Sequence, residues 1–377
     1  MKIACFLFDP NIGGPHVRAA GVYSILRLRG FEPVIVLPEL EGSAYGYFTS
    51  QNIVAKKVAF TKPVSPTRVL RFLKYIAMVP NSVHRIVNFL KKGDYDLVHV
   101  NGAADICPVL AAKLCKIPVV WHLNDTALPK VVARLFAKII KSLSDRVVIA
   151  AKAVGEHYGL KEEDSLVLYA PVNIKSFPAR KLKMSPSDGD TISIGVLGNW
   201  NWIKGQDRFL DLIDLLLERN YKVRAVIIGG FPEKQSNFWA PLLKKIEYSA
   251  LSNVVDVVGF IRDPRDYLDG LDILVLTSRS EACPISVLEG MAIGIPQVAF
   301  KVGGVDEMLN RETDAISGLV VPEGDVEAMA DAIGDLLSDR RLFLKVQANG
   351  QKVAREIFSL DLCAERHSQL YKEVRVM

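Results

Sequence analysis

Short apolar runs alternate along this chain with longer segments in which apolar side chains recur at helical spacing. The runs are apolar on both faces, as are parallel strands that helices cover on each side. In the first half they lie at residues 2–8, 33–37, 96–100, 118–122 and 145–150. The pattern restarts at 191–198 and continues at 223–230, 254–260, 272–277 and 296–300. The alternation predicts an α/β protein with parallel sheets.

A polar stretch that contains proline, residues 183–190, separates the two series of strands and is typical of a linker. Together with the length of 377 residues, it predicts two doubly wound, Rossmann-like domains that face each other across a cleft. We place the first domain at 1–185 and the second at 186–359, and we expect a helix over about 360–377 to pack back onto the first. Ligands of such sheets bind outside the carboxyl ends of the strands.

Composition narrows the class of protein. Half of the residues are apolar, so each domain can bury a core, yet no 18 consecutive residues are apolar and no transmembrane helix is predicted. The N-terminal apolar run is too short for a signal peptide and is interpreted as a first strand. The net charge of +5 is too small to indicate nucleic-acid binding. The scattered cysteines are typical of reduced thiols in a cytoplasmic protein: Cys5, Cys107, Cys115, Cys283 and Cys363.

Two glutamates, Glu281 and Glu289, lie eight residues apart in the run TSRSEACPISVLEGMAIGIP. The apolar run 272–277 precedes them, and Pro284 suits the first turn of a helix that extends to about Ile293. Glu281 is therefore expected in a loop at the carboxyl end of a strand, and Glu289 within the helix that follows. The start of this helix offers free backbone N–H groups, which attract phosphate, at Ile285, Ser286 and Val287.

A carboxylate on each side of a phosphate site suits a ligand with hydroxyl groups at both ends. A nucleotide sugar is such a ligand, with ribose on one side and a hexose on the other. The alternative is that both glutamates lie on a solvated helix face, where this residue type is common.

Several motifs of the second half resemble the retaining glycosyltransferases of family 4, which have the GT-B fold. The similar pieces cover most of residues 194–340 and include VLGNWNWIKGQDRFL, AVIIGG, VVGF, the long run from DYLDGLDILVLT to GGVDEML, and GLVVPEGDVEAMADAIGDLL. The first half is similar more loosely, through Gly13-Gly14 after the first strand, DLVHVNG and PVVWHLND.

The resemblance implies a role for matching residues of the second half. It makes Lys204 the cation that holds the donor diphosphate and stabilises the charge that develops on it. It makes Glu281 a partner of the donor-sugar hydroxyls and Glu289 a partner of the ribose hydroxyls. A surface lysine at a helix start is the alternative for Lys204, although a cation there is unfavourable.

In the first half, the resemblance makes His122 the active-site histidine that approaches the donor sugar. A structural histidine at a strand end is the alternative. Gly13 and Gly14 allow the backbone to approach the donor closely, although a tight turn between strand and helix needs the same residues.

One departure from the family concerns the diphosphate. Gly198 is followed by Asn199, where the family usually has arginine, so one cation is missing beside Lys204. Asn199 still offers hydrogen bonds to the donor, and Arg279 or Arg18 is expected to compensate for the charge.

No metal site is predicted, and no cofactor besides the nucleotide-sugar co-substrate. The chain has two Asp-x-Asp triplets, Asp94-Tyr95-Asp96 and Asp188-Gly189-Asp190. The first precedes a strand and the second lies in the expected linker, so both are interpreted as turns. No His/Cys cluster has the spacing of metal ligands.

Two basic amphipathic segments, 66–92 and 129–143, lie in the first half. Either each packs an apolar stripe on the sheet, or the two contact an anionic membrane surface. Their joint occurrence suits peripheral membrane contact, at the inner face, and a lipid-linked acceptor.

The resemblance thus implies a retaining glycosyltransferase that uses a UDP-sugar, or else a GDP-sugar. The expected acceptor is a carbohydrate or lipid-linked molecule, in assembly of a cell-surface polysaccharide or glycolipid. An epimerase or a sugar phosphorylase of the same fold, and a catalytically inactive nucleotide-sugar-binding subunit, are the alternatives.

Overall fold

The computed structural model describes residues 1–64, 69–187, 189–310 and 316–376 and divides into two compact units. The first unit contains Met1–Pro171 and Leu360–Met377, and the second contains Val172–Ser359. The boundary lies earlier than residue 185, because the stretch after Pro171 is bound to the second unit. The Arg180 side chain donates to the carbonyl oxygens of Asp269 and Leu271, each at 3.0 Å.

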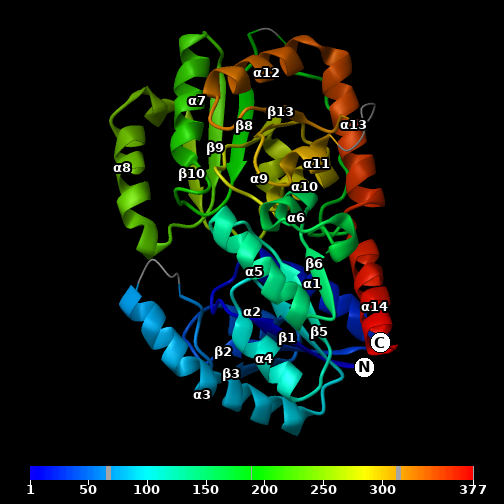
Figure 1. Ribbon diagram of the computed structural model, residues 1–377. Coiled ribbons are helices and arrows are strands. Elements are labelled where there is room, and N and C mark those ends of the chain that lie inside the picture. The colour runs from blue at the N-terminus through cyan, green and yellow to red at the C-terminus, as the bar shows by residue number, and fades with distance from the viewer. Residues whose placement is uncertain (65–68, 188, 311–315, 377) are drawn as a thin grey trace. The chain divides into compact units, whose positions relative to one another are not determined.

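The first unit is built on a seven-stranded sheet in the order β3-β2-β1-β4-β5-β6-β7 (Figure 1). Every neighbouring pair is parallel, so the carboxyl ends of the strands lie along the same edge. The strands are β1 (Lys2–Leu7), β2 (Glu32–Pro38), β3 (Ala55–Val58), β4 (Leu97–Asn101), β5 (Val119–Leu123), β6 (Arg146–Ile149) and β7 (Leu166–Val167).

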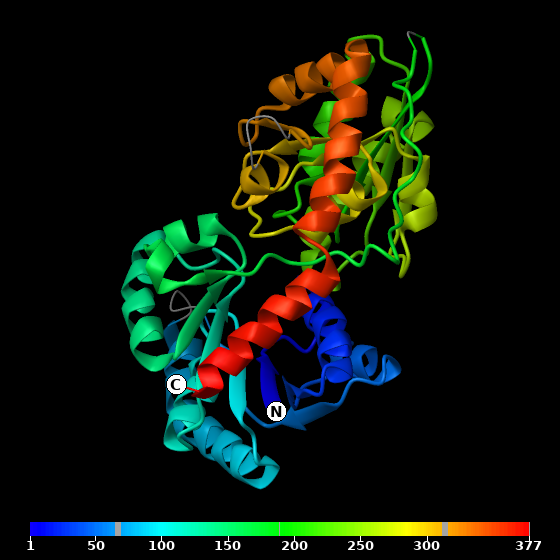
Figure 2. The same ribbon diagram turned by 90° about the vertical axis from the view of Figure 1, so that its right-hand side faces the viewer.

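Helices cover both faces of this sheet. The helices α3, α4 and α5 lie on one face, and α1 and α2 lie on the other, with α14 packed against α1 (Figure 2). The helices of the unit are α1 (Gly14–Leu28), α2 (Ala44–Ser50), α3 (Val69–Gly93), α4 (Ile106–Leu114), α5 (Lys130–Leu143), α6 (Lys152–Tyr158), the 3₁₀ turn η1 (Glu162–Asp164) and α14 (Leu360–Val376).

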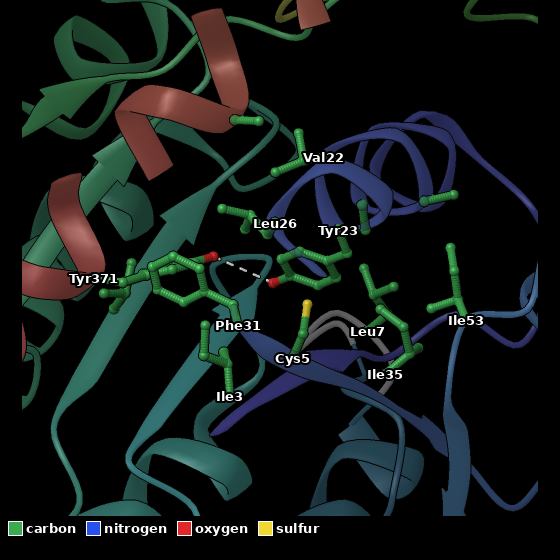
Figure 3. Close-up of a cluster of buried hydrophobic side chains, with 14 of the residues drawn as sticks. Ile3, Cys5, Leu7, Val22, Tyr23, Leu26, Phe31, Ile35, Ile53 and Tyr371 are labelled. Atoms are coloured by element: carbon green, nitrogen blue, oxygen red, sulfur yellow. Dashed lines mark hydrogen bonds between the residues drawn. The ribbon is translucent and has the colours of Figure 1, made fainter. Parts of the chain in front are cut away.

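The core of the first unit contains side chains from both the N-terminal and the C-terminal segments of the protein. Side chains of β1 and α1 pack with those of α14, and Figure 3 shows the ring of Tyr371 beside that of Tyr23. The two hydroxyl oxygens are 3.3 Å apart. The last helix is therefore part of the first core, although the whole second unit precedes it in the chain.

The second unit has a six-stranded parallel sheet in the order β10-β9-β8-β11-β12-β13. The strands are β8 (Ile192–Leu197), β9 (Val223–Ile228), β10 (Val255–Gly259), β11 (Ile273–Leu276), β12 (Gln297–Phe300) and β13 (Leu319–Val321). The helices are α7 (Gln206–Glu218), η2 (Glu233–Gln235), α8 (Ser236–Glu247), η3 (Ala250–Asn253), α9 (Arg265–Gly270), α10 (Ile285–Ile293), α11 (Val305–Leu309), α12 (Val326–Ser338) and α13 (Arg340–Glu356).

The predicted α/β architecture with two parallel sheets is confirmed. The basic segment 66–92 forms one helix from Val69, with Pro80 inside it; residues 66–68 lie outside the described residues. Among the described helices, none is both long and apolar enough to cross a membrane.

Candidate functional site

Three loops meet at the carboxyl edge of the second sheet. The loop after β8 contacts the loop after β11 at Gly205, whose φ is +69° and on which a Cβ atom would collide with the carbonyl oxygen of Thr277. The loop after β12 contacts the same β11 loop at Gly303, whose φ is +50° and whose Cβ would collide with the carbonyl oxygen of Glu281. Only glycine fits both the backbone angle and the space at these positions.

Lys204 and Glu281 lie side by side where these loops meet. The Lys204 ammonium is 2.6 Å from Glu281 Oε1, and the Ser278 hydroxyl donates to the same oxygen at 2.7 Å. The side chains are 29% and 11% exposed, so the pair lies at the surface of the unit but is mostly shielded. Asn201 fixes the loop backbone at Lys204, because its Oδ1 accepts from the backbone N–H of Lys204 at 3.0 Å.

Asn199 connects two loops of the same edge. Its Oδ1 accepts from the backbone N–H of Gly230, after β9, at 3.1 Å. The buried Gln206 donates to the carbonyl oxygens of Gly198 and Asn199, at 3.0 and 3.2 Å. The Asn199 oxygen is therefore engaged in the fold, and the amide nitrogen is the part of this side chain suited to a ligand.

Arg279, one of the two arginines expected to replace the missing cation, is already paired with a carboxylate. Its guanidinium forms a two-bonded ion pair with Asp207, at 2.5 and 2.9 Å, and stacks 4.7 Å from the ring of Trp202. The pair with Asp207 raises the pKa of Arg279 further. Arg18, the other expected substitute, is buried in the core of the first unit.

Helix α10 begins one residue later than predicted. Pro284 is its N-cap, with extended backbone, rather than its first helical residue. The Val287 N–H donates to the Pro284 carbonyl oxygen at 3.2 Å, so it is already engaged. The first N–H groups of a helix have no helical acceptor, and here those of Ile285 and Ser286 are the ones suited to phosphate.

Glu289 lies one turn further along α10 and is half-buried. Within the described chain its carboxylate accepts no hydrogen bond from a side chain or backbone group. Burial, and then the negative charge of Asp263, raises the pKa of Glu289 to about 8. A shielded carboxylate without donors favours ligands that bring hydroxyl groups to it.

A cavity of about 280 Å³ opens at the carboxyl edge of the first sheet. Gly13, the N-cap of α1, lines it, whereas Gly14 is the first residue of the helix itself. The His16 ring closes this turn, because Nδ1 accepts from the Gly13 N–H at 3.2 Å and Nε2 donates to the Asp9 carbonyl oxygen at 2.9 Å. The polar side chains of the wall are Asp9, Asn11, His16, Asn101, Asn124 and Asp125.

Arg18 is bonded to two side chains of the cavity wall and is only 5% exposed. Its guanidinium donates to Asn124 Oδ1 at 2.6 Å, to His122 Nε2 at 2.8 Å and to Asn101 Oδ1. These partners are neutral, so the charge of Arg18 is not balanced by a neighbouring carboxylate among them. Two of them, Asn101 and Asn124, also line the cavity.

His122 is fully buried and contacts Arg18 and His99. Burial, and then the charge of Arg18, keeps the pKa of His122 well below its usual range. Since an arginine can only donate, Nε2 of the neutral His122 accepts and Nδ1 carries the proton, 3.3 Å from His99 Nε2. His99 Nδ1 in turn lies 2.6 Å from the Tyr371 hydroxyl. Asn124, two residues later, lines the cavity, whereas His122 does not.

The structure describes both aspartates of the first Asp-x-Asp triplet but only one of the second. Asp96 accepts from the Lys2 N–H at 2.7 Å, and Asp94 has a φ of +50°, as in a turn. Asp190 accepts from the Ser187 N–H at 2.9 Å, whereas Asp188 lies outside the described residues. In the part of the chain that the structure describes, no three His, Cys, Asp or Glu side chains come together as metal ligands.

Sequence reasoning missed three contributors: Ser278, Asn124 and Gly303. Ser278 lies three residues before Glu281 in the loop that was singled out, and its hydroxyl was a visible signal. Asn124 directly follows β5, so the rule that sites lie beyond strand ends could have found it. Gly303 belongs to a Gly-Gly pair, for which a backbone contact is the usual reason.

Comparison with known proteins gives two family matches. Residues 191–339 match the model described as glycosyl transferases group 1, and residues 12–175 match glycosyltransferase family 4. The mannosyltransferase LpsB of lipopolysaccharide core biosynthesis, from Rhizobium meliloti, is 26% identical over 48% of this chain and 51% of its own, so only about half of that relative is spanned. The O-antigen chain mannosyltransferase C of Escherichia coli is 24% identical over 78% of this chain and 80% of its own.

Among solved structures, Anabaena HepE in complex with UDP superposes with a TM-score of 0.81, over 99% of this chain and 100% of its own, at 19% identity. This likeness shows the same fold.

We expect Gly303→Ala to destabilise the protein by about 2–4 kcal/mol, because left-handed strain adds to a collision with the Glu281 carbonyl. Gly30→Ala is a matched control, since its φ is +80° but no atom lies within 4 Å of a Cβ there. The free energies of unfolding of both variants, measured in urea, separate the cost of the steric collision from the cost of backbone strain. Equal losses would contradict the tight loop contact.

The raised pKa of Glu289 predicts a pH dependence of stability. The fold favours the protonated form, so the folded chain binds more protons than the unfolded chain between pH 4.5 and about 8. The contribution of Glu289 to the free energy of unfolding therefore falls as the pH rises through this window. We expect Glu289→Gln to flatten this fall in urea unfolding, whereas Gln at the exposed Glu247 leaves it unchanged. An unchanged slope in Glu289→Gln would refute the assignment.

Proposed function

Because the chain belongs to the family 4 glycosyltransferases and has the GT-B fold, we propose that it transfers a sugar from a nucleoside diphosphate sugar to an acceptor hydroxyl, with retention of configuration. The observation that carries this proposal is the pair of Lys204 and Glu281, 2.6 Å apart, in the loops before α7 and α10. It offers a cation for phosphate and a carboxylate for sugar hydroxyls at one edge of a parallel sheet.

The proposed donor is a UDP-sugar, and a GDP-sugar is the alternative. Its support is Anabaena HepE, whose solved complexes contain UDP and UDP-glucose. In our assignment Glu289 accepts from the ribose hydroxyls, and the N–H groups of Ile285 and Ser286, with Lys204, hold the diphosphate. Asn199 adds a neutral donor through its amide nitrogen.

In the proposed step, the bond between the sugar C1 and the diphosphate oxygen breaks while the acceptor oxygen bonds C1 from the same face. The acceptor proton passes to the departing phosphate oxygen. Lys204 stabilises the negative charge that develops there, and a preorganised cation does so without reorganisation. Glu281 holds the lysine ammonium in place and accepts from hydroxyls of the donor sugar.

For the acceptor we propose a carbohydrate or a lipid-linked carbohydrate, in polysaccharide or glycolipid assembly at the inner face of a membrane. The names of the lipopolysaccharide-core and O-antigen relatives support this class. The cavity of the first unit suits it chemically, because the amide and carboxylate groups of Asn124 and Asp125 can bind hydroxyl groups in both directions.

The experiment that tests the proposal is Lys204→Ala. We expect turnover of a UDP-sugar, with acceptor or by slow hydrolysis without one, to fall on the order of a hundredfold or more, because one preorganised donor to the leaving group is lost. Lys245→Ala is the matched control, since it removes a lysine that pairs with Asp211 and Asp214 in the same unit. Wild-type turnover in Lys204→Ala would place the phosphate site elsewhere.

We also expect activity to persist in excess EDTA, because leaving-group charge is assigned to Lys204 and helix N–H groups. The measurement compares initial rates before and after chelation. Complete loss of activity, with recovery on adding magnesium or manganese, would show that metal-binding carboxylates were misinterpreted as turns.

A further inference from the structure

Two helices of the first unit, α3 and α5, concentrate the positive charge of the protein. Together they contain nine lysines and arginines and no acidic residue. The other parts of the chain hold the remaining 38 of 47 basic residues against all 42 acidic ones. The rest of the protein is therefore slightly acidic, and the mild net charge of +5 conceals a strongly basic surface.

Helix α5 exposes an apolar row next to a basic row. Residues four apart lie above one another on a helix. The helix buries only three small or medium side chains against the unit, those of Ala133, Ala137 and Ile140. The exposed apolar row consists of Val131, Leu135 and Ile139, and the exposed basic row consists of Lys130, Arg134 and Lys138.

The exposed apolar row is not accounted for by packing. Val131 is 73% exposed and Leu135 is 62% exposed, although burying such side chains is favourable. The sequence leaves two alternatives open, packing on the sheet and contact with a membrane. Packing on the sheet accounts for only part of the apolar surface of α5. The other part, the row of Val131, Leu135 and Ile139, is exposed.

Helix α3 repeats the pattern on the same face of the sheet, with α4 between the two (Figure 2). Its first turns expose Leu70, which is 84% exposed, together with Leu73 and Ile76. Arg71 and Lys74 are exposed beside them. Both helices thus present branched aliphatic side chains with cations alongside.

We propose that the exposed face of α3 and α5 docks on an anionic lipid surface, with the aliphatic row inserted among the acyl chains and the basic row at the headgroups. The charge selects this partner: a second copy of the chain would bring two basic rows together, and nucleic acid would leave the aliphatic row without a role. The surface lies in the first unit alone and does not depend on the proposed transferase activity.

The proposal is tested by flotation of the purified full chain with vesicles of phosphatidylcholine, with and without phosphatidylglycerol. We expect binding only to the anionic vesicles, and weaker binding as salt increases. The triple variant Lys130→Gln, Arg134→Gln, Lys138→Gln should bind about a hundredfold more weakly, since each cation near such a surface contributes about fivefold. The variant Leu135→Ser, Ile139→Ser should lose on the order of tenfold.

Matched controls distinguish binding through this face from binding that depends only on the net charge or on any exposed apolar side chain. Gln at the exposed Lys234, Lys345 and Lys352, in the second unit, removes the same charge and should leave binding near wild type. Leu28→Ser removes an 88% exposed leucine from α1, on the opposite face, and should also bind normally. Circular dichroism of each variant checks the fold.

Three outcomes overturn the proposal. They are absence of binding to anionic vesicles by the wild type, equal losses in the controls, and a dimer in sedimentation that Leu135→Ser, Ile139→Ser dissolves while vesicles remain unbound. The last would make the face an interface between copies of the chain.

Discussion

Direct contact between backbone segments holds the polar groups of the second unit together. In a parallel sheet every strand delivers its following loop to the same edge, but nothing in that topology brings the loops within hydrogen-bonding distance. Gly205 and Gly303 do so, since each lets one loop touch a carbonyl oxygen of the β11 loop. Lys204 and Glu281 are neighbours of these contacts, so their separation of 2.6 Å is set by the backbone rather than by flexible side chains alone.

The two units treat a shielded cation in different ways. Lys204 is balanced by a carboxylate, which offsets the cost of removing its charge from water. Arg18 is more deeply buried but is held by two amide oxygens and an imidazole nitrogen. No carboxylate among these partners cancels its charge, and burial, with the charge of Arg18 as a further cause, keeps the pKa values of His122 and His99 well below their usual range. A chain of hydrogen bonds then runs from the cavity-lining Asn101 and Asn124 through the Arg18 guanidinium. It continues through the neutral His122 and His99 to Tyr371 of α14.

Much of the fold could be predicted because its central strands are long and apolar on both faces. The strands β3, β7 and β13 are not predicted, since they are short and all three lie at sheet edges. The motifs of the second half point to Glu281 and Lys204, and the structure brings the two side chains together. His122 shows the limit of sequence prediction, because the sequence does not mark where the strand ends. His122 lies inside β5 and is fully buried, whereas Asn124 lies just past the strand and lines the cavity.

The place of α14 has a consequence for synthesis on the ribosome. Domains generally fold as units while the chain is being made. The second unit is continuous, from Val172 to Ser359, and all of it has been translated before α14. Synthesis of the first unit begins earlier. Its core is nevertheless incomplete until Leu360–Val376 has emerged, because Tyr371 and its neighbours in α14 are part of that core. The half of the protein that is translated first is thus the half that is completed last, and until then the apolar surface of α1 that packs on α14 lacks its partner.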